Sequence, residues 1–254
     1  MNIVVCAKQV VDVGEIKVNP STNKPVLEGI PKKISDIDKN AAEEAIKIKE
    51  KLGGKVTVIT VGPEDARERV KELLAMGADE GMIIVPPQGS DYHIASSLIA
   101  AAIRKIGNVD LILCGEASID LFAGQMGPRI AGALDIPQLT YAFKILPEAA
   151  KVTAERNLGD KMVVTESTLP ALITVTKEIN IPRLPSLMQI LGSAKKPINI
   201  VKAETMGVAD LAPKVVTEDV RGVTMVRKNI VYKDDLDQGV ASLADNLAKD
   251  GVLG

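Results

Sequence analysis

Residues 111–138, LILCGEASIDLFAGQMGPRIAGALDIPQ, are the clearest candidate for ligand chemistry in this sequence. The segment starts as a short apolar run, typical of a strand buried on both faces, and breaks at Gly115. Helical periodicity returns after a small-residue turn at 123–128. A glycine-bearing turn between a strand and a helix leaves backbone N–H groups unpaired at the positive end of the helix. Such a turn can hold a phosphate, so we interpret it as a nucleotide site to which the N–H groups of residues 124–126 point.

The glycine spacing alone leaves the ligand open. The turn has neither the GK[ST] of a P-loop nor the GxGxxG of a dinucleotide turn. Pro128 fits a first helical turn, where a missing N–H costs no hydrogen bond. Gly124, Gly127 and Gly132 form a G-x2-G-x4-G pattern, which keeps a universal-stress-type ATP-binding module as an alternative of another class. A nucleotide hydrolase is disfavoured, because a Ser-Gly-Gly loop and a metal-binding carboxylate cluster are both lacking.

Composition narrows the classes of function. A net charge of −2 over 254 residues gives no electrostatic reason to expect nucleic acid or an anionic membrane as partner. One histidine, no CxxC and 2% aromatic residues argue against zinc sites, histidine triads and base-stacking platforms. No apolar run reaches the roughly 18 residues that span a bilayer, and no signal-peptide layout is present, so we expect a cytoplasmic protein without a membrane span. Cys6 and Cys114 should be buried free thiols.

Strands and helices alternate along the first 140 residues, which predicts a mostly parallel sheet with right-handed crossovers. The expected strands span residues 2–5, 55–61, 81–85 and 111–114. The expected helices run from 39 to 52, from Gly62-Pro63 to Gly77, and from Ser90 or Asp91 to Ile106, with Asp36 or Asp38 capping the first. The strand ends at Cys6, Val61 and Gly115 should then converge on one crevice, with Lys8 close enough to meet a phosphate.

The pattern changes beyond this alternating part. Residues 151–156 and 161–166 flank the turn sequence NLGD and predict an antiparallel hairpin, followed by a strand over 171–175. Residues 11–34 predict a long loop that contains a hairpin, of a length that usually carries function or contacts a partner.

From Ile181 the sequence has few periodic runs until a terminal helix, whose apolar face carries Val240, Leu243, Ala244 and Leu247. This tail has little core of its own, so it should dock either on its own domain or on another subunit. We expect a nucleotide-binding α/β domain over residues 1–190 and a C-terminal arm and helix over 191–254. The predicted fold is an open, mostly parallel, doubly wound and Rossmann-like sheet with an antiparallel hairpin.

Several segments match one known family in order and in spacing. They are VVCAKQVVD, DKNAAEEAIKIKEKLGG, VTVITVGPEDARERVKELLAMGADE, DLILCGEASID, GQMGPRIAGALDIPQ, and LPALITVTKEINIPRLPSLMQI followed by AKKPI. Together they show that the chain resembles the β subunit of electron transfer flavoproteins over essentially its whole length. The resemblance implies a heterodimer with a larger, flavin-carrying α subunit, and an adenine nucleotide held in the crevice of this subunit.

The resemblance also implies the site residues. Cofactor contacts would fall on Cys6, Ala7, Lys8, Ser35, Asp38, Asn40, Val61, Gly62, Gly115, Glu116, Ala117, Ser118, Asp120, Ala123, Gly124, Gln125, Met126 and Gly127. The loop that docks partner dehydrogenases would be residues 182–191, with Leu187 as the apolar anchor beside Leu184 and Met188. Leu187 should be exposed in an isolated subunit; the alternative is that it covers the protein's own core.

Departures from the family pattern bear on the cofactor. The branch that resembles a simple electron carrier, with AMP in this subunit, has Asn-Gln-Thr-Gly where this chain has GQMG at 124–127. The absent threonine hydroxyl is a phosphate donor worth about 1–3 kcal/mol to a charged acceptor. Met-Gly-Pro is closer to the Val-Gly-Pro of the electron-bifurcating branch, whose β subunit holds a second FAD, and Val61-Gly62-Pro63 and Lys39-Asn40 point the same way. Against it, DLFA at 120–123 stands where that branch has Asp-Gly-Asp-Thr. We expect FAD, with AMP as the alternative.

With FAD, the resemblance implies that NADH gives a hydride to this flavin, which sends one electron to the α-subunit flavin and one to a low-potential acceptor such as ferredoxin. With AMP, the pair would carry electrons for an acyl-CoA or other flavin dehydrogenase. The chain supplies binding, orientation and electrostatics, and none of its residues is expected to act as nucleophile or general base. Lys8 or the turn N–H groups are the candidates to stabilise reduced, anionic flavin. The length of the tail bears on the universal-stress-type alternative. Such modules end with the sheet, whereas this chain continues far past Ile181, which favours the electron transfer flavoprotein interpretation.

Overall fold

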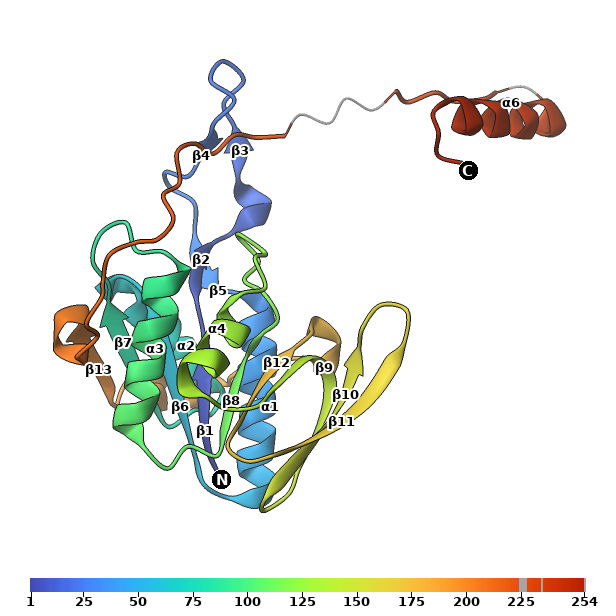
Figure 1. Ribbon diagram of the computed structural model, residues 1–254. Coiled ribbons are helices and arrows are strands. Elements are labelled where there is room, and N and C mark those ends of the chain that lie inside the picture. Colours follow the sequence, from blue (N-terminus) through green and yellow to red (C-terminus); the bar gives the residue numbers. More distant parts are fainter. Residues whose placement is uncertain (224–227, 234, 254) are drawn as a thin grey trace.

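A nine-stranded sheet forms the centre of the molecule (Figure 1). The computed structural model describes residues 1–223, 228–233 and 235–253. In sheet order the strands are β11 (Met162–Thr168), β10 (Lys151–Asn157), β9 (Gln138–Pro147), β12 (Ala171–Val175), β8 (Leu111–Gly115), β1 (Asn2–Cys6), β6 (Lys55–Val61), β7 (Glu80–Val85) and β13 (Ile198–Lys202). From β9 to β13 neighbouring strands are parallel, and β10 and β11 add an antiparallel hairpin at one edge.

Helices cover both faces of the sheet. α1 (Asp36–Leu52) and α2 (Arg67–Met76) pack on one face, and α3 (Tyr92–Ile106) and α4 (Met126–Leu134) pack on the other. Because successive strand residues point to opposite faces, the buried strands feed two apolar clusters: Val58 joins the α1 side and Ile59 the α3 side. The predicted doubly wound α/β fold is confirmed.

The remaining elements are short or stand apart from the main sheet. Two small antiparallel pairs, β2 (Gln9–Val11) with β5 (Lys32–Ile34) and β3 (Lys17–Val18) with β4 (Pro25–Val26), confirm a hairpin in the long loop. The 3-10 helices are η1 (Val13–Glu15), η2 (Glu64–Ala66), η3 (Lys177–Ile179) and η4 (Ala203–Met206); the other α-helices are α5 (Leu187–Ser193) and α6 (Leu236–Lys249). None of the described helices is both long and apolar enough to cross a bilayer.

The start of α1 differs from the prediction. The helix begins at Asp36 rather than at residue 39, and Ser35 occupies the N-cap without a side-chain cap hydrogen bond, so neither Asp36 nor Asp38 is the cap. Asp38 lies inside the first turn, where its buried carboxylate bonds to other segments. By contrast, Asp91 caps α3 as predicted, its Oδ1 accepting the Ile94 N–H at 3.0 Å.

Three features of the structure were not predicted from the sequence: the full length of β9, the short helix α5, and β13. β13 pairs in parallel with β7, Ile198 lying opposite Gly81, and as a five-residue edge strand it is only half-buried. η4 follows and buries Ala203 and Met206. β13 and η4, which both lie beyond residue 190, therefore pack on the α/β body.

Candidate functional site

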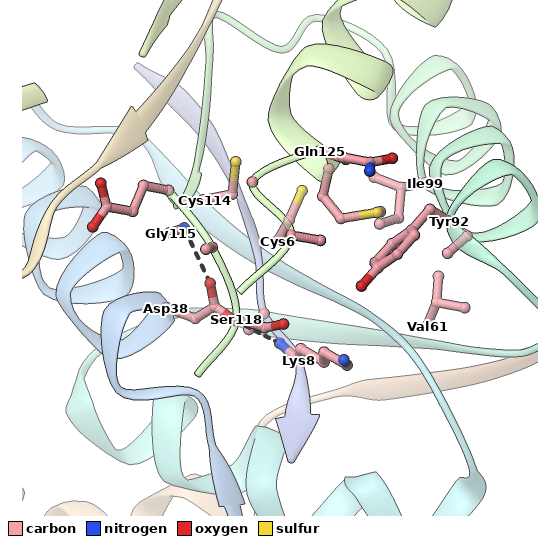
Figure 2. A pocket seen from close by; sticks show the side chains of 17 residues that line it. Cys6, Lys8, Asp38, Val61, Tyr92, Ile99, Cys114, Gly115, Ser118 and Gln125 are labelled. Atoms are coloured by element: carbon pink, nitrogen blue, oxygen red, sulfur yellow. Dashed lines mark hydrogen bonds between the residues drawn. The ribbon is translucent and has the colours of Figure 1, made fainter. Parts of the chain in front are cut away.

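A pocket lies at the carboxyl edge of the sheet, where the strand order reverses. From β1 the chain proceeds to β6 and β7 on one side, and it later places β8 on the other side of β1. Open α/β sheets bind ligands at such a switch point. Cys6 and Cys114 lie opposite each other in the register of β1 and β8, and both line the pocket (Figure 2). Val61 and Gly115 join them, so the strand ends expected to converge do so.

The pocket gathers most of the candidate cofactor residues. Its free volume is about 730 Å³, a figure that includes space open to solvent. The candidates that line it are Cys6, Ala7, Lys8, Asp38, Val61, Gly115, Glu116, Ala117, Ser118, Ala123, Gly124, Gln125 and Met126. The candidates that do not line it are Ser35, Asn40, Gly62, Asp120 and Gly127.

One wall of the pocket was missed. Tyr92, Ala95 and Ile99 contribute it from α3, and Cys114 adds to the floor (Figure 2). The three α3 residues follow at spacings of three and four, so they share one helix face. The sequence pattern identifies that face, but only the packing of α3 across β6 brings it to the strand ends.

Asp38 ties two strand ends together under the pocket. Its Oδ2 accepts the Lys8 N–H at 2.9 Å and its Oδ1 accepts the Gly115 N–H at 3.0 Å (Figure 2). Burial raises the pKa of Asp38 to about 7, although these two hydrogen bonds and the Lys8 charge act to lower it. A Cβ on residue 115 would come within 2.7 Å of the Asp38 Oδ1, so glycine is required there for the contact.

The positive charge of Lys8 is already partnered. Its Nζ lies 2.6 Å from the Asp120 Oδ2, and both side chains are partly exposed at the rim. Burial raises the pKa of Asp120, but hydrogen bonds from Lys8 and Ser118 and the Lys8 charge outweigh it and hold the pKa below its usual value. Asp120 therefore acts on the pocket through Lys8 rather than by lining it.

The turn before α4 presents a helix start to the pocket. Gln125 occupies the N-cap, and no side chain of the described residues caps the helix, so its first N–H groups are available to a ligand. Gly127 is outside the pocket but positions the turn, because a Cβ there would collide with the Thr174 side chain of β12. Glycine at 127 thus allows α4 to begin directly against the sheet.

The two cysteines contribute apolar surface. Both are free and buried, as predicted. Burial, with a smaller effect of the Asp38 charge, raises the pKa of Cys6 to about 12, and burial also raises the pKa of Cys114. Neutral thiols are poor nucleophiles. No cluster of potential metal ligands occurs within the described part of the chain.

Two candidates away from the pocket hold loops in place. The Asn40 Nδ2 donates to the Asn180 carbonyl at 2.8 Å, and the Asn180 Nδ2 donates back to the Asn40 carbonyl at 3.0 Å. Ser35 accepts the Ile119 N–H at 3.3 Å. These contacts fix the segment after η3 and the loop after β8, so both residues shape the site indirectly.

Comparison with known proteins identifies the family. The electron transfer flavoprotein domain matches residues 26–206. The electron transfer flavoprotein subunit beta of Thermoanaerobacterium thermosaccharolyticum is 43% identical over 211 residues, which cover 82% of this chain and 81% of the relative. The chain belongs to the electron transfer flavoprotein β-subunit family. This confirms the resemblance and removes the universal-stress-type alternative.

Other relatives of this electron transfer flavoprotein β subunit bear more specific names. CarD, a subunit of the caffeyl-CoA reductase-Etf complex of Acetobacterium woodii, is 40% identical over 212 residues, covering 82% of this chain and 81% of the relative. The acryloyl-CoA reductase electron transfer subunit gamma of Anaerotignum propionicum is 38% identical over 214 residues, covering 81% and 79%.

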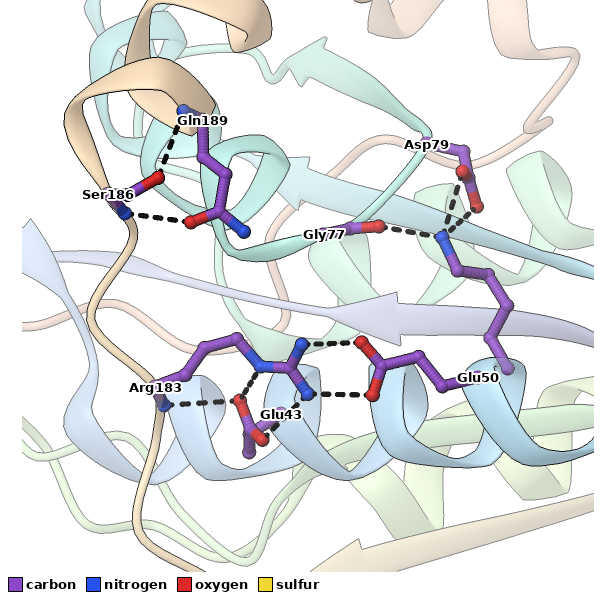
Figure 3. A network of polar contacts seen from close by, with 8 residues as sticks. Glu43, Glu50, Gly77, Asp79, Arg183, Ser186 and Gln189 are labelled. Carbon is purple, nitrogen blue, oxygen red and sulfur yellow. Dashed lines mark hydrogen bonds and ion pairs between the residues drawn. The ribbon is translucent and has the colours of Figure 1, made fainter.

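The expected docking loop, residues 182–191, is exposed on this β subunit. Leu184, Leu187 and Met188 are 94%, 71% and 76% exposed, so the alternative that Leu187 covers the protein's own core is wrong. The loop is held at its start by Arg183, whose guanidinium bonds to Glu43 and Glu50 on α1 (Figure 3). A capping box between Ser186 and Gln189 fixes the start of α5. Rigid attachment of exposed apolar side chains is typical of a preorganised binding surface.

Proposed function

We propose that this electron transfer flavoprotein β subunit binds FAD in the pocket at the ends of β1, β6 and β8. With an FAD-carrying α subunit it passes electrons from NADH to two acceptors by flavin-based bifurcation. The observation that carries the proposal is the composition of the pocket: an uncapped helix start on one side and an apolar wall from α3 on the other. A flavin dinucleotide carries both a diphosphate and planar ring systems, which these two sides of the pocket could contact.

The pocket residues fit that ligand. The N–H groups at the start of α4 can donate to phosphate oxygens, assisted by the helix dipole. Val61, Ile99 and the neutral thiols of Cys6 and Cys114 offer apolar contact to a ring. Lys8 supplies positive charge at the rim, and Asp38 keeps the ends of β1 and β8 at a fixed separation.

FAD, when bound, supplies hydride acceptance from NADH and one-electron transfer. The chain's own part is to bind and orient the ring and to keep water from it. Asp38 fixes the pocket floor, α3 forms the wall, and the Lys8–Asp120 pair sets the charge near the ring.

The names of two relatives support the choice of partner. Both join an electron transfer subunit to a reductase of a CoA ester, caffeyl-CoA in one and acryloyl-CoA in the other. We take the partner of this chain to be a flavin dehydrogenase that acts on CoA esters and docks on Leu184, Leu187 and Met188. Ferredoxin is the proposed second, low-potential acceptor.

A simple carrier with AMP in this pocket is the second candidate. The same helix start would hold a single phosphate, and the sequence at 120–123 departs from the bifurcating pattern. Leu121 and Phe122 of that segment are 62% and 66% exposed, so they add no wall to the pocket. AMP would need only part of the pocket and would leave no role for the α3 wall in electron transfer.

Counting nucleotides decides between the two. The α/β pair is purified after co-expression, and FAD and AMP are released and quantified per heterodimer. We expect two FAD; one FAD with one AMP would replace bifurcation with simple carriage. Ala95→Phe places a phenyl group in the pocket space beside α3, so this variant should bind one FAD per heterodimer instead of two. Retention of both FAD would mean that the second flavin lies elsewhere.

A further inference from the structure

The C-terminal arm, defined here as residues 207–223, runs along the N-terminal half of α3 after leaving the sheet (Figure 1). Val208 and Leu211 of the arm pack against the apolar cluster that contains Ile94 and Leu98 of α3. Farther on, the Gly222 N–H donates to the Asn23 carbonyl of the β3–β4 hairpin at 2.8 Å. The arm is thus attached to the body at several points before it reaches α6.

Asp91 is shared between the arm and α3. Its Oδ1 accepts the Ile94 N–H at 3.0 Å, which caps the helix. Its Oδ2 accepts the N–H groups of Lys214 and Val215 at 2.7 and 3.0 Å. One carboxylate therefore closes the first turn of α3 and fastens the arm to the same turn.

That turn is also part of the pocket. Tyr92, the residue after Asp91, lines the pocket together with Ala95 and Ile99 (Figure 2). A displacement of the arm that pulls on Asp91 acts on the helix turn that carries Tyr92. The other end of the arm leads to α6, none of whose described residues is buried.

We propose that Asp91 is a positioning residue that couples the C-terminal arm to the cofactor pocket. With the arm fastened, the first turn of α3 holds the pocket wall in place; with the arm released, the wall loosens and the cofactor binds more weakly. A partner subunit that grips the tail would then modulate cofactor affinity from a distance. The inference rests on the proposed function, because it takes the pocket to be the FAD site.

Asp91→Asn separates the two roles of the side chain. Asparagine is as good an N-cap as aspartate, so its Oδ1 can still accept the Ile94 N–H. Its amide group donates rather than accepts, and therefore cannot bond to the N–H groups of Lys214 and Val215. Asp91→Ala removes the cap and the arm attachment together. Asp210→Asn is the matched control, because the hydrogen bonds of Asp210 within the described residues stay inside the arm, to the Ala212 N–H and the Lys214 Nζ.

The test uses the purified α/β pair in its wild-type form and with each variant. Hydrogen exchange reports on the arm, and the FAD dissociation constant of the β-subunit site reports on the pocket. In Asp91→Asn we expect the amides of residues 214 and 215 to exchange about tenfold faster, as the loss of a charge-assisted hydrogen bond predicts. FAD affinity at this site should fall roughly three- to tenfold, against less than about twofold in Asp210→Asn.

Three results would contradict different parts of this inference. Unchanged exchange at residues 214 and 215 in Asp91→Asn would overturn the attachment. Faster exchange with an FAD affinity equal to that of Asp210→Asn would overturn the coupling while leaving the proposed function intact. A wild-type pair without FAD in this subunit would overturn the proposed function and the coupling with it.

Discussion

Two carboxylates at the pocket differ in their proton affinity because their partners differ. Asp120 is paired with a lysine ammonium, and its pKa is below the usual value. Asp38 is buried with two backbone N–H groups as partners, and its pKa rises from 3.8 to about 7. The Asp38 hydrogen bonds cannot fully compensate for its loss of solvation. Charge at the pocket floor therefore changes near neutral pH, whereas charge at the rim does not.

Asp38→Asn should change how stability depends on pH. Between its usual pKa of 3.8 and about 7, folded Asp38 binds more protons than unfolded Asp38, so its contribution to stability falls as pH rises through this window. The asparagine cannot titrate and satisfies only one of the two N–H groups, which costs about 1–3 kcal/mol. As pH rises through this window, the free energy of unfolding of the variant should therefore increase relative to that of wild type by up to about 1.4 kcal/mol per pH unit. Urea unfolding of the isolated subunit at several pH values measures this, and a difference that stays constant would contradict it.

Lys8 and Asp120 should shift the flavin potential in opposite directions. Lys8→Ala leaves Asp120 unpaired near the ring and disfavours reduced, anionic flavin, so the potential falls; Asp120→Asn leaves the ammonium unpaired, so the potential rises. A charge effect of about 1 kcal/mol corresponds to roughly 20 mV for a two-electron couple. Spectroelectrochemical titration of the heterodimer measures both variants. The double variant is the control and should lie near wild type; an unchanged potential in Lys8→Ala would remove Lys8 from this role.

At the scale of elements, Arg183 joins the docking loop to α1 through two unequal partners. The Glu43 side chain is 3% exposed and the Glu50 side chain is 53% exposed (Figure 3). Removing the Arg183 guanidinium leaves the buried Glu43 carboxylate without a partner, whereas removing the Glu50 carboxylate breaks only a solvent-exposed ion pair. Loss of the guanidinium should therefore lower the stability of the subunit more than loss of Glu50.

Arg183→Gln should therefore destabilise the subunit by about 3 kcal/mol or more, and Glu50→Gln by less than about 1 kcal/mol. Denaturant unfolding gives the free energies, and hydrogen exchange of residues 184–191 shows whether the loop loosens. Equal effects of the two substitutions would mean that Glu43 is not held by Arg183. Leu187→Ala serves as the docking control: it should leave stability unchanged and raise the KM for the partner dehydrogenase.

Local signals in the sequence identified most of the sheet. β6 and β12 are short runs of mostly β-branched and apolar residues, and α3 has both its cap at Asp91 and its glycine stop at Gly107, so their bounds follow from neighbouring residues. β13 was not predicted because it is only five residues long and none of its residues is fully buried. The strand ends at the pocket could be predicted from topology, but the α3 wall and the Asp38 contacts depend on how distant segments pack. The Asn40 contact is of the same kind: its amide donates to the Asn180 carbonyl, a residue 140 positions away in the sequence.

On the scale of the whole molecule, the body and the tail differ in how they bury apolar residues. The sheet and α1 to α4 enclose two apolar clusters, whereas α6 stands away from them and leaves Leu236, Val240 and Leu243 exposed at 77%, 59% and 47% (Figure 1). An amphipathic helix with an uncovered apolar face is unfavourable in water, and burial of that face contributes about 25 cal/mol per Å². We expect that the α subunit buries this apolar face of α6.

A chain that ends at residue 223 should keep the body and lose affinity for the α subunit. The truncation spares β13, η4 and the Asp91 contacts, so thermal unfolding should be close to that of the full chain. Loss of the apolar face of α6 should weaken binding of the α subunit by about 3 kcal/mol or more, which is at least a hundredfold in dissociation constant. Calorimetric titration measures this. Leu243→Asp in the full chain is the matched control, because it polarises the same face without shortening the tail. If both variants bind the α subunit like wild type, the exposed face of α6 must serve another partner, because no described residue of the body covers it.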